Sequence, residues 1–451
     1  MLFSSFEFLF RFLPVFLVIY YLTPKKFRNV TLLGGSIVFY TIGEAGYITI
    51  LLACVLVNYT LTRLMYRKNT DGRGIRQKRL LLLALGYDLG VLFFFKYSGL
   101  ASGLPLGISF YTFQIMAYVI DVYRGRIPAE QSLLRLGTYL TMFPQLISGP
   151  ITNYADVRVA LGRERKIKAR QLEEGMKLLI IGLAAKVVIA DRIGTLWNSI
   201  RMIGFDSIST KLAWMGAFAY SLQLYFDFAG YSMMARGIGK MLGFELPVNF
   251  RYPYISKSVT EFWRRWHITL GRWFREYVYI PLGGNRKGKA RTFFNLFVVW
   301  SLTALWHGAK YNFLIWGGIL LCCLLVEKLF LLRLLDKSRV IGHLYVLFVV
   351  PLSWVAFAVT DLSELGVYMT RLFPFAGHAA GVINHLDYLK YLNDYAPLFL
   401  LGVLFATPLP ETCYRLIERR WIGRVILLGI FGLCMYYLAV SANNPFLYFN
   451  F

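Results

Sequence analysis

Residues 341 to 359 read IGHLYVLFVVPLSWVAFAV, an apolar run with one histidine and no acid, lysine or arginine. A membrane-spanning helix needs about 20 consecutive, mostly apolar residues. Similar runs recur along the chain, and 57% of its 451 residues are hydrophobic. A soluble chain of this length would form two or three domains. This composition instead predicts one all-α, polytopic membrane domain over residues 1–451.

Charged clusters divide the apolar runs into candidate membrane spans. The predicted spans lie near 2–23, 29–43, 47–66, 80–97, 104–122, 174–192, 211–230, 293–309, 312–334, 341–360, 397–410 and 424–443. Some are shorter than a straight span of about 20 residues, so the expected bundle has about 11 to 12 transmembrane helices. Residues 135–150 contain Pro144 and lie between two basic clusters, which predicts a re-entrant segment lining a cavity.

The formal net charge is +25. Basic residues between apolar runs are orientation signals that mark cytoplasmic loops, so the charge does not indicate nucleic-acid binding. These clusters are Lys25 to Arg28, Arg67 to Arg79, Arg124 to Arg126, Arg163 to Arg170, Arg251 to Arg291, Lys337 to Arg339 and Arg415 to Arg424. The acidic loop from Asp361 to Asp394 should face outward. The five cysteines have no metal-type spacing, and we expect no metal site.

The largest basic stretch forms a predicted amphipathic insert on the cytoplasmic side, near 236–291. Between Val259 and Val278 apolar residues recur at helical spacing, which predicts a helix with one apolar face. The opposite face carries Arg264, Arg265, Arg272 and Arg275. These arginines either anchor the helix on anionic lipid or also hold a phosphate-rich donor. The glycine-rich turn at 279–288 lacks the spacing of a Walker loop and is a weak phosphate signal.

Two histidines are candidate catalytic groups. His307 lies in Trp306-His307-Gly308 inside an apolar run, and His267 follows Trp266. An ionisable side chain at membrane depth is costly unless it is used or satisfied, and a histidine can take up and return a proton near neutral pH. The alternative for His307 is a core histidine bonded to Thr303 or Ser301. His343, His378 and His385 are interpreted as boundary or loop histidines.

Asp227 has Gln223 one turn before it on the same helical face. Asp227 either orients a catalytic histidine or pairs with an arginine in a structural role, and the structural role is the favoured interpretation. The chain lacks a Gly-x-Ser-x-Gly motif and a nucleotide-binding loop. Histidine-assisted transfer of a group to a hydroxyl fits these residues, and a proton-coupled transporter or flippase of an acyl or glycan intermediate is the alternative.

A series of motifs resembles the membrane-bound O-acyltransferase (MBOAT) family, and within it the subgroup that contains the membrane subunit of bacterial alginate O-acetylation. The motifs are Phe3 to Ser5, Tyr111 to Gln114, Asp121 to Arg124, Phe143 to Pro150, Tyr225 to Phe228, Glu261 to His267, Tyr279 to Gly288, Leu305 to Gly308 and Asn444 to Phe449. The resemblance implies an MBOAT-type bundle around a central funnel, with re-entrant and interfacial helices. It departs from the subgroup at Met233 and Glu276, where aspartate is usual.

The resemblance also implies a reaction and its participants. An acyl group, usually acetyl, would pass from a cytoplasmic thioester, acetyl-coenzyme A or acyl carrier protein, to an extracytoplasmic polysaccharide such as alginate. No permanently bound cofactor is implied. The essential histidine of the family corresponds to His307 and its second histidine to His267. Apart from the resemblance, we expect the four arginines with Trp266 and Trp306 to hold the donor. The resemblance implies a separate extracytoplasmic serine-esterase-like partner protein. It also implies a location in the bacterial inner membrane.

Overall fold

The computed structural model describes residues 1–66, 74–100, 103–376, 383–418 and 420–440. The described residues form helices and turns and contain no strand, which confirms the predicted all-α class. Five of their helical segments are long and apolar enough to cross a membrane, or six if a pair bent by 74° forms one span. The motif from Asn444 to Phe449, His378 and the basic positions 67–73 lie outside the described residues.

The chain divides into two compact units, the first comprising Met1–Gly182 and Tyr231–Val248, the second Leu183–Gly230 and Asn249–Phe451. The helices that begin in unit 1 are η1 (Glu7–Phe12), α1 (Leu13–Leu22), η2 (Lys25–Phe27), α2 (Arg28–Glu44), η3 (Ala45–Tyr47), α3 (Ile48–Met65), α4 (Ile75–Tyr97), α5 (Ile108–Tyr123), α6 (Leu133–Thr141), α7 (Phe143–Leu146), α8 (Tyr154–Gly162) and α9 (Ala169–Ala184).

Unit 2 contains the remaining helices, and one of them, α11, also enters unit 1. They are η4 (Ala185–Ala190), α10 (Asp191–Ile203), η5 (Phe205–Ser207), α11 (Thr210–Met241), η6 (Pro253–Ile255), α12 (Val259–Arg265), α13 (Ile268–Phe274), η7 (Arg275–Tyr279), α14 (Gly288–His307), α15 (Tyr311–Val326), η8 (Glu327–Leu331), α16 (Leu332–Leu335), α17 (Arg339–Ala358), α18 (Leu362–Leu372), η9 (Pro374–Ala376), α19 (Asp387–Phe405), α20 (Leu409–Ile417) and α21 (Trp421–Val440).

The segment predicted to be re-entrant folds as two short helices, α6 and α7, in the interior of unit 1. Phe143 at the start of α7 is buried and meets the rings of Phe12 and Phe16 edge to face, at 5.5 and 5.2 Å between centroids. Gly107 has a φ of +75°, and a Cβ there would lie 2.3 Å from the carbonyl oxygen of Leu146. Glycine at position 107 therefore allows the backbone before α5 to lie against the end of α7.

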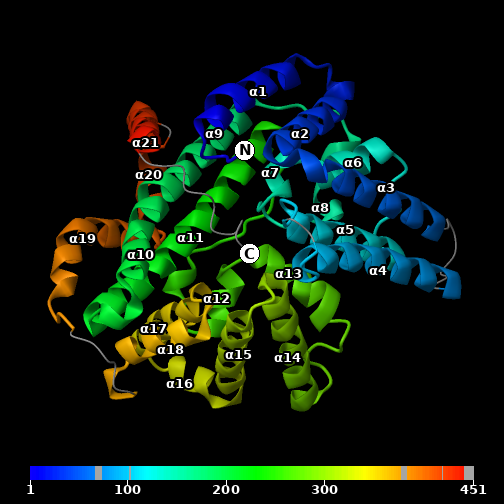
Figure 1. The fold of residues 1–451 in the computed structure, drawn as a ribbon. Coiled ribbons are helices and arrows are strands. Elements are labelled where there is room, and N and C mark those ends of the chain that lie inside the picture. Colours follow the sequence, from blue (N-terminus) through cyan, green and yellow to red (C-terminus); the bar gives the residue numbers. More distant parts are fainter. Residues whose placement is uncertain (67–73, 101–102, 377–382, 419, 441–451) are drawn as a thin grey trace. The chain divides into compact units, whose positions relative to one another are not determined.

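In unit 2, α14 packs against α15 and α15 against α17 (Figure 1). Gly317 on α15 allows this approach, because a Cβ at that position would lie 2.9 Å from the Cβ of Ala304 on α14. Small residues at helix contacts are the usual way in which membrane helices come close together. The three helices bring the end of α14 next to the aromatic faces of α15 and α17.

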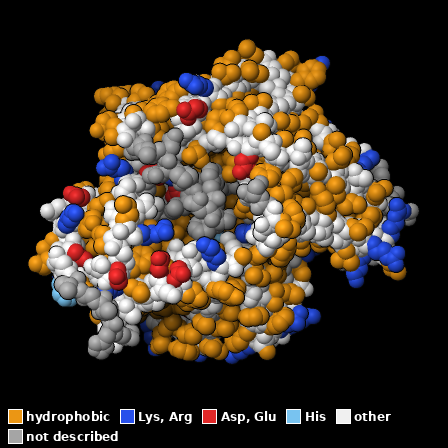
Figure 2. Space-filling model, in the orientation of Figure 1, with side chains coloured by type: hydrophobic (Ala, Val, Ile, Leu, Met, Phe, Trp, Pro, Cys, Tyr) orange, Lys and Arg blue, Asp and Glu red, His pale blue; other side chains and the backbone are white. Residues whose placement is uncertain are grey.

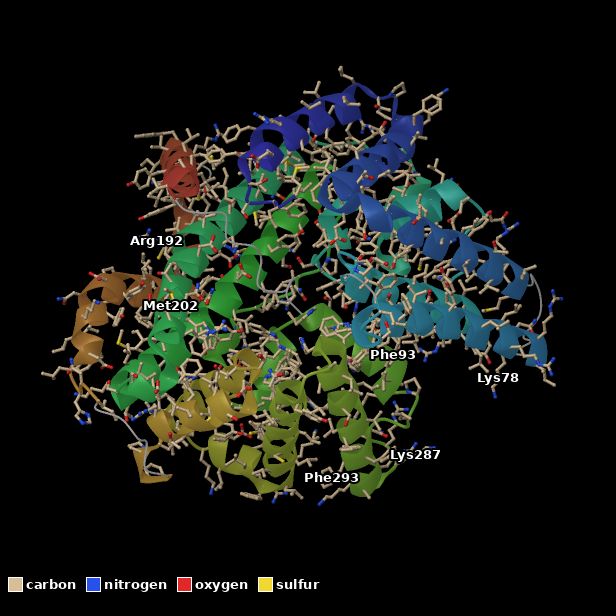
Figure 3. The ribbon with its side chains drawn as sticks, in the orientation of Figure 1. Lys78, Phe93, Arg192, Met202, Lys287 and Phe293 are labelled. Atoms are coloured by element: carbon tan, nitrogen blue, oxygen red, sulfur yellow. The ribbon has the colours of Figure 1, made fainter. Side chains whose placement is uncertain are left out.

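Apolar side chains cover the outer faces of the span-like helices, as the orange areas over α3, α4 and α14 show (Figure 2). They include Leu52, Leu56, Leu82, Leu83, Phe93, Phe294 and Phe297, all more than 40% exposed. In Figure 3, Lys78 lies near the start of α4 and Lys287 just before α14, with Phe93 and Phe293 further along the same two helices. A polar end and an apolar flank are typical of helices in a bilayer.

Candidate active site

His307 is the last residue of α14, and its side chain is 4% exposed. Its imidazole is enclosed by Trp306, Phe313, Trp316 and Phe357, with ring centroids at 4.7, 6.2, 5.0 and 5.1 Å. The glycine after it is required by space, since a Cβ at Gly308 would lie 2.4 Å from the ring of Phe313. The Trp-His-Gly sequence therefore encodes a buried imidazole with an aromatic ring closed over the following residue.

The prediction of one continuous helix from Val259 to Val278 is wrong. Most of the apolar face of this segment is buried as expected, but α12 ends at Arg265 and α13 begins at Ile268. His267 between them has left-handed backbone angles, φ 42° and ψ 52°. A side chain with a Cβ adopts this conformation at a cost of about 1–2 kcal/mol. Such a cost persists where the surroundings impose it, often at functional sites.

The surroundings that hold His267 are supplied by Asn249. Its Oδ1 lies 3.1 Å from Nδ1 of His267 and accepts hydrogen bonds from the backbone N–H and the hydroxyl of Thr269, at 3.3 and 2.9 Å. A backbone N–H can only donate, so the atom facing it is the amide oxygen. Nδ1 of His267 must therefore carry the proton. Nε2 of the neutral imidazole then bears a lone pair.

Burial lowers the pKa of His267 to about 3. The imidazole is enclosed by apolar rings, with Phe228 at 4.8 Å, so the charged form loses its solvation there. His267 is consequently neutral at physiological pH, and the lone pair on Nε2 makes that atom a hydrogen-bond acceptor.

Trp306 contacts the rings of both candidate catalytic histidines. Its indole lies 4.7 Å from the His307 ring and 6.3 Å from the His267 ring, both centroid distances. The histidines come from α14 and from the turn before α13, forty residues apart in the sequence. The fold of unit 2 thus brings the two candidate catalytic groups to one buried indole, 7% exposed.

The predicted donor-binding residues are divided between surface and core. Arg264 and Arg275 are exposed, and Arg272 is partly exposed. Arg265 forms an ion pair with Glu261 at 2.8 Å. Trp266 is 1% exposed and belongs to the aromatic core.

Asp227 on α11 forms an ion pair with Lys186, at 2.6 Å between Oδ1 and Nζ. Lys186 also pairs with Asp191 at 2.6 Å. Gln223, one turn before Asp227, packs against α10, where a Cβ at Gly194 would lie 2.2 Å from its Nε2. The carboxylate of Asp227 therefore contacts a lysine that the sequence interpretation did not identify. An ionisable residue within the span predicted at 174–192 was the available signal.

Glu327 is a second residue that the sequence interpretation missed. Its carboxylate is 1% exposed and accepts hydrogen bonds from the backbone N–H groups of Val259 and Thr260, at 2.6 and 2.8 Å. These are the first two residues of α12, where N–H groups have no partner within the helix. Glu327 thereby fixes the position of the segment that leads to His267. An acid within the predicted span 312–334 was the signal.

Glu327→Gln is expected to destabilise the protein by about 1–3 kcal/mol, because the amide keeps one acceptor and turns an NH₂ toward a backbone donor. The thermal midpoint of the purified protein in detergent measures the effect. Glu364→Gln is the matched control, since Glu364 is exposed at the start of α18. Equal midpoints for the two variants would contradict this role of Glu327.

Comparison with known proteins gives one family and several relatives. The MBOAT, membrane-bound O-acyltransferase family, matches residues 37–363. A probable alginate O-acetylase of Pseudomonas putida is 34% identical, with 100% of both chains covered. A peptidoglycan O-acetyltransferase of Helicobacter pylori is 29% identical over 100% of this chain and 98% of its own. A teichoic acid D-alanyltransferase of Bacillus subtilis is 32% identical over 48% of this chain and 58% of its own.

Proposed function

The chain belongs to the membrane-bound O-acyltransferase family, and on that premise we propose that it moves an acetyl or other acyl group onto hydroxyls of an extracytoplasmic glycan. It is a multi-pass membrane protein and an O-acyltransferase. The proposed donor is a cytoplasmic thioester, acetyl-coenzyme A or acyl carrier protein, and the proposed location is the bacterial inner membrane. Alginate or another envelope polymer is the proposed acceptor, because the relatives are named for alginate, peptidoglycan and teichoic acid.

The proposal is supported by two buried histidines, His307 and His267, that contact the same indole of Trp306. In the proposed reaction His307 takes the proton of the attacking hydroxyl, whose oxygen bonds to the thioester carbonyl carbon. The tetrahedral intermediate then re-forms its carbonyl as the C–S bond breaks, and His307 returns the proton to the thiolate. His267, which is neutral and has a lone pair on Nε2, accepts a hydrogen bond from a neighbouring hydroxyl of the acceptor and thereby positions the attacking hydroxyl.

The arginines of the amphipathic segment are the proposed contacts for the donor's phosphates. Arg264 and Arg275 are exposed and carry charge at a surface rich in cations. Trp266 and Trp306 are both buried, so they would contact the acyl end of the donor or influence its binding through neighbouring residues. We propose that a separate extracytoplasmic serine-esterase-like protein takes part in the final delivery to the glycan.

Transfer of labelled acetyl from acetyl-coenzyme A into alkali-labile envelope material tests the function. Membranes that contain the chain should incorporate label, and the assay is run with and without a serine-esterase-like partner. Incorporation that requires a partner would support shared delivery. Proton-dependent movement of a glycan without any acyl transfer would favour the transporter alternative.

Asn249→Asp is expected to make transfer sensitive to acid. A carboxylate at Nδ1 favours imidazolium and raises the pKa of His267 from about 3. Below the raised value Nε2 becomes a donor and can no longer accept from the neighbouring hydroxyl of the acceptor, so kcat/KM should fall as the pH decreases. The wild type should show no such loss from His267 between pH 5 and 7.

The pH profile of kcat/KM from pH 5 to 8 checks this, with Thr269→Val as the control. That change removes one hydroxyl contact to Asn249 and introduces no charge. Superimposable acid limbs in Asn249→Asp and wild type would exclude His267 as an acceptor for the neighbouring hydroxyl.

A further inference from the structure

Trp316 lies on α15 and is 0% exposed. No described residue accepts a hydrogen bond from its indole N–H. A buried donor without a partner costs about 1–3 kcal/mol. Trp316 also lies within the span-like segment Tyr311–Leu335, where lipid offers no replacement partner. An N–H without an acceptor at this position would lower the stability of the fold. This indicates that a group outside the polypeptide accepts the hydrogen bond.

The orientation of Trp316 is fixed by its neighbours. Its ring packs against Trp263, Trp300, Trp354 and Phe357, with centroids at 5.8, 5.8, 5.9 and 5.2 Å. These contacts come from α12, α14 and α17, so the indole is held on several sides. A donor held in this way does not need to reorient when charge develops near it.

Trp316 lies against the proposed catalytic base. Its ring centroid is 5.0 Å from that of His307, and the two planes meet at 85°. A group that reacts at His307 would therefore lie beside this indole. In acyl transfer, the atom that most needs a donor is the carbonyl oxygen, which becomes an oxyanion in the tetrahedral intermediate.

We propose that the indole N–H of Trp316 donates a hydrogen bond to the carbonyl oxygen of the acyl donor and stabilises the oxyanion that forms on it. As the hydroxyl oxygen bonds to the carbonyl carbon, the π pair moves onto this oxygen and the proton goes to His307. When the C–S bond breaks, the pair returns and the thiolate receives the proton. Trp316 stays protonated throughout. The proposal rests on the proposed function and names a further catalytic residue for it.

Trp316→Phe removes the N–H and keeps an aromatic ring in the cage. We expect kcat to fall about 10²-fold or more, while KM for acetyl-coenzyme A changes by less than about threefold, because the interaction strengthens in the transition state. Trp300→Phe is the matched control: it makes the same change in a neighbouring indole that contacts Trp263 and Trp316. Its kcat should stay within about threefold of the wild type.

A second variant separates chemistry from packing. Incorporation of 3-benzothienylalanine at position 316 replaces the N–H by sulfur and preserves the ring shape, so it should fold and show the same loss of kcat. Binding of acetonyl-coenzyme A, which has a carbonyl, should exceed that of propyl-coenzyme A in the wild type. The preference should shrink in both variants.

The outcomes distinguish this inference from the proposed function. A wild type that transfers acetyl while the benzothienyl variant keeps its kcat would overturn the role of Trp316 alone and leave its N–H bonded to water. A wild type that transfers nothing from acetyl-coenzyme A or acetylated acyl carrier protein would overturn the proposed function and this role together.

Discussion

His307→Ala should lower acetyl transfer by about 10²- to 10⁴-fold, the usual contribution of a general acid or base. His307 is buried in an aromatic enclosure and contacts Trp306, which also contacts His267. No exposed group can therefore take over its proton transfer without a rearrangement of these rings. The measurement is kcat/KM for labelled acetyl transfer in membranes matched for protein content.

Two further variants make this result specific. His307→Gln retains more of the side-chain volume and limits the cavity that alanine would leave, so an equal loss of activity would point to chemistry. His343→Ala is the control, since His343 is a partly buried histidine on α17 that lies 3.1 Å from the carbonyl oxygen of Ser256. Transfer at the wild-type rate by folded His307→Gln protein would exclude proton transfer by His307.

Lys186→Met should cause the largest loss of stability, about 3–5 kcal/mol, because it removes the cation of a buried ionic cluster. Lys186 pairs at 2.6 Å with both Asp191 and Asp227, and its side chain is 5% exposed. Without the ammonium group, two nearby carboxylates would remain in a site from which water is largely excluded. The yield of folded protein in detergent and its thermal midpoint measure this effect.

The stability lost in Lys186→Met should be partly recovered by removing the two carboxylate charges as well. Adding Asp191→Asn and Asp227→Asn to Lys186→Met removes the stranded charges and should recover part of the stability. Lys211→Met is the control, because Lys211 is exposed on α11 and its ammonium group contacts the hydroxyl of Tyr388. A triple variant no more stable than Lys186→Met would show that the charges are not the cause.

The sequence was sufficient for features that depend on local pattern. Long apolar runs predicted an all-α membrane protein because a helix satisfies its own backbone in lipid. The periodicity between Val259 and Val278 predicted which face would be buried, and the Trp-His-Gly motif made His307 a candidate catalytic residue, which stays a prediction. Each signal is contained in a short segment, and each follows from burial or from the chemistry of a single side chain.

The tertiary structure decided the features that need distant segments. Asn249 holds His267 from eighteen residues away, and Glu327 anchors Val259 from sixty-eight residues away. The left-handed turn at His267 also broke the predicted helix, although periodicity continued through it. Helical periodicity reports which side of a segment avoids water. It carries no information on which distant polar group meets a buried donor or acceptor, and that pairing decides how this site is built.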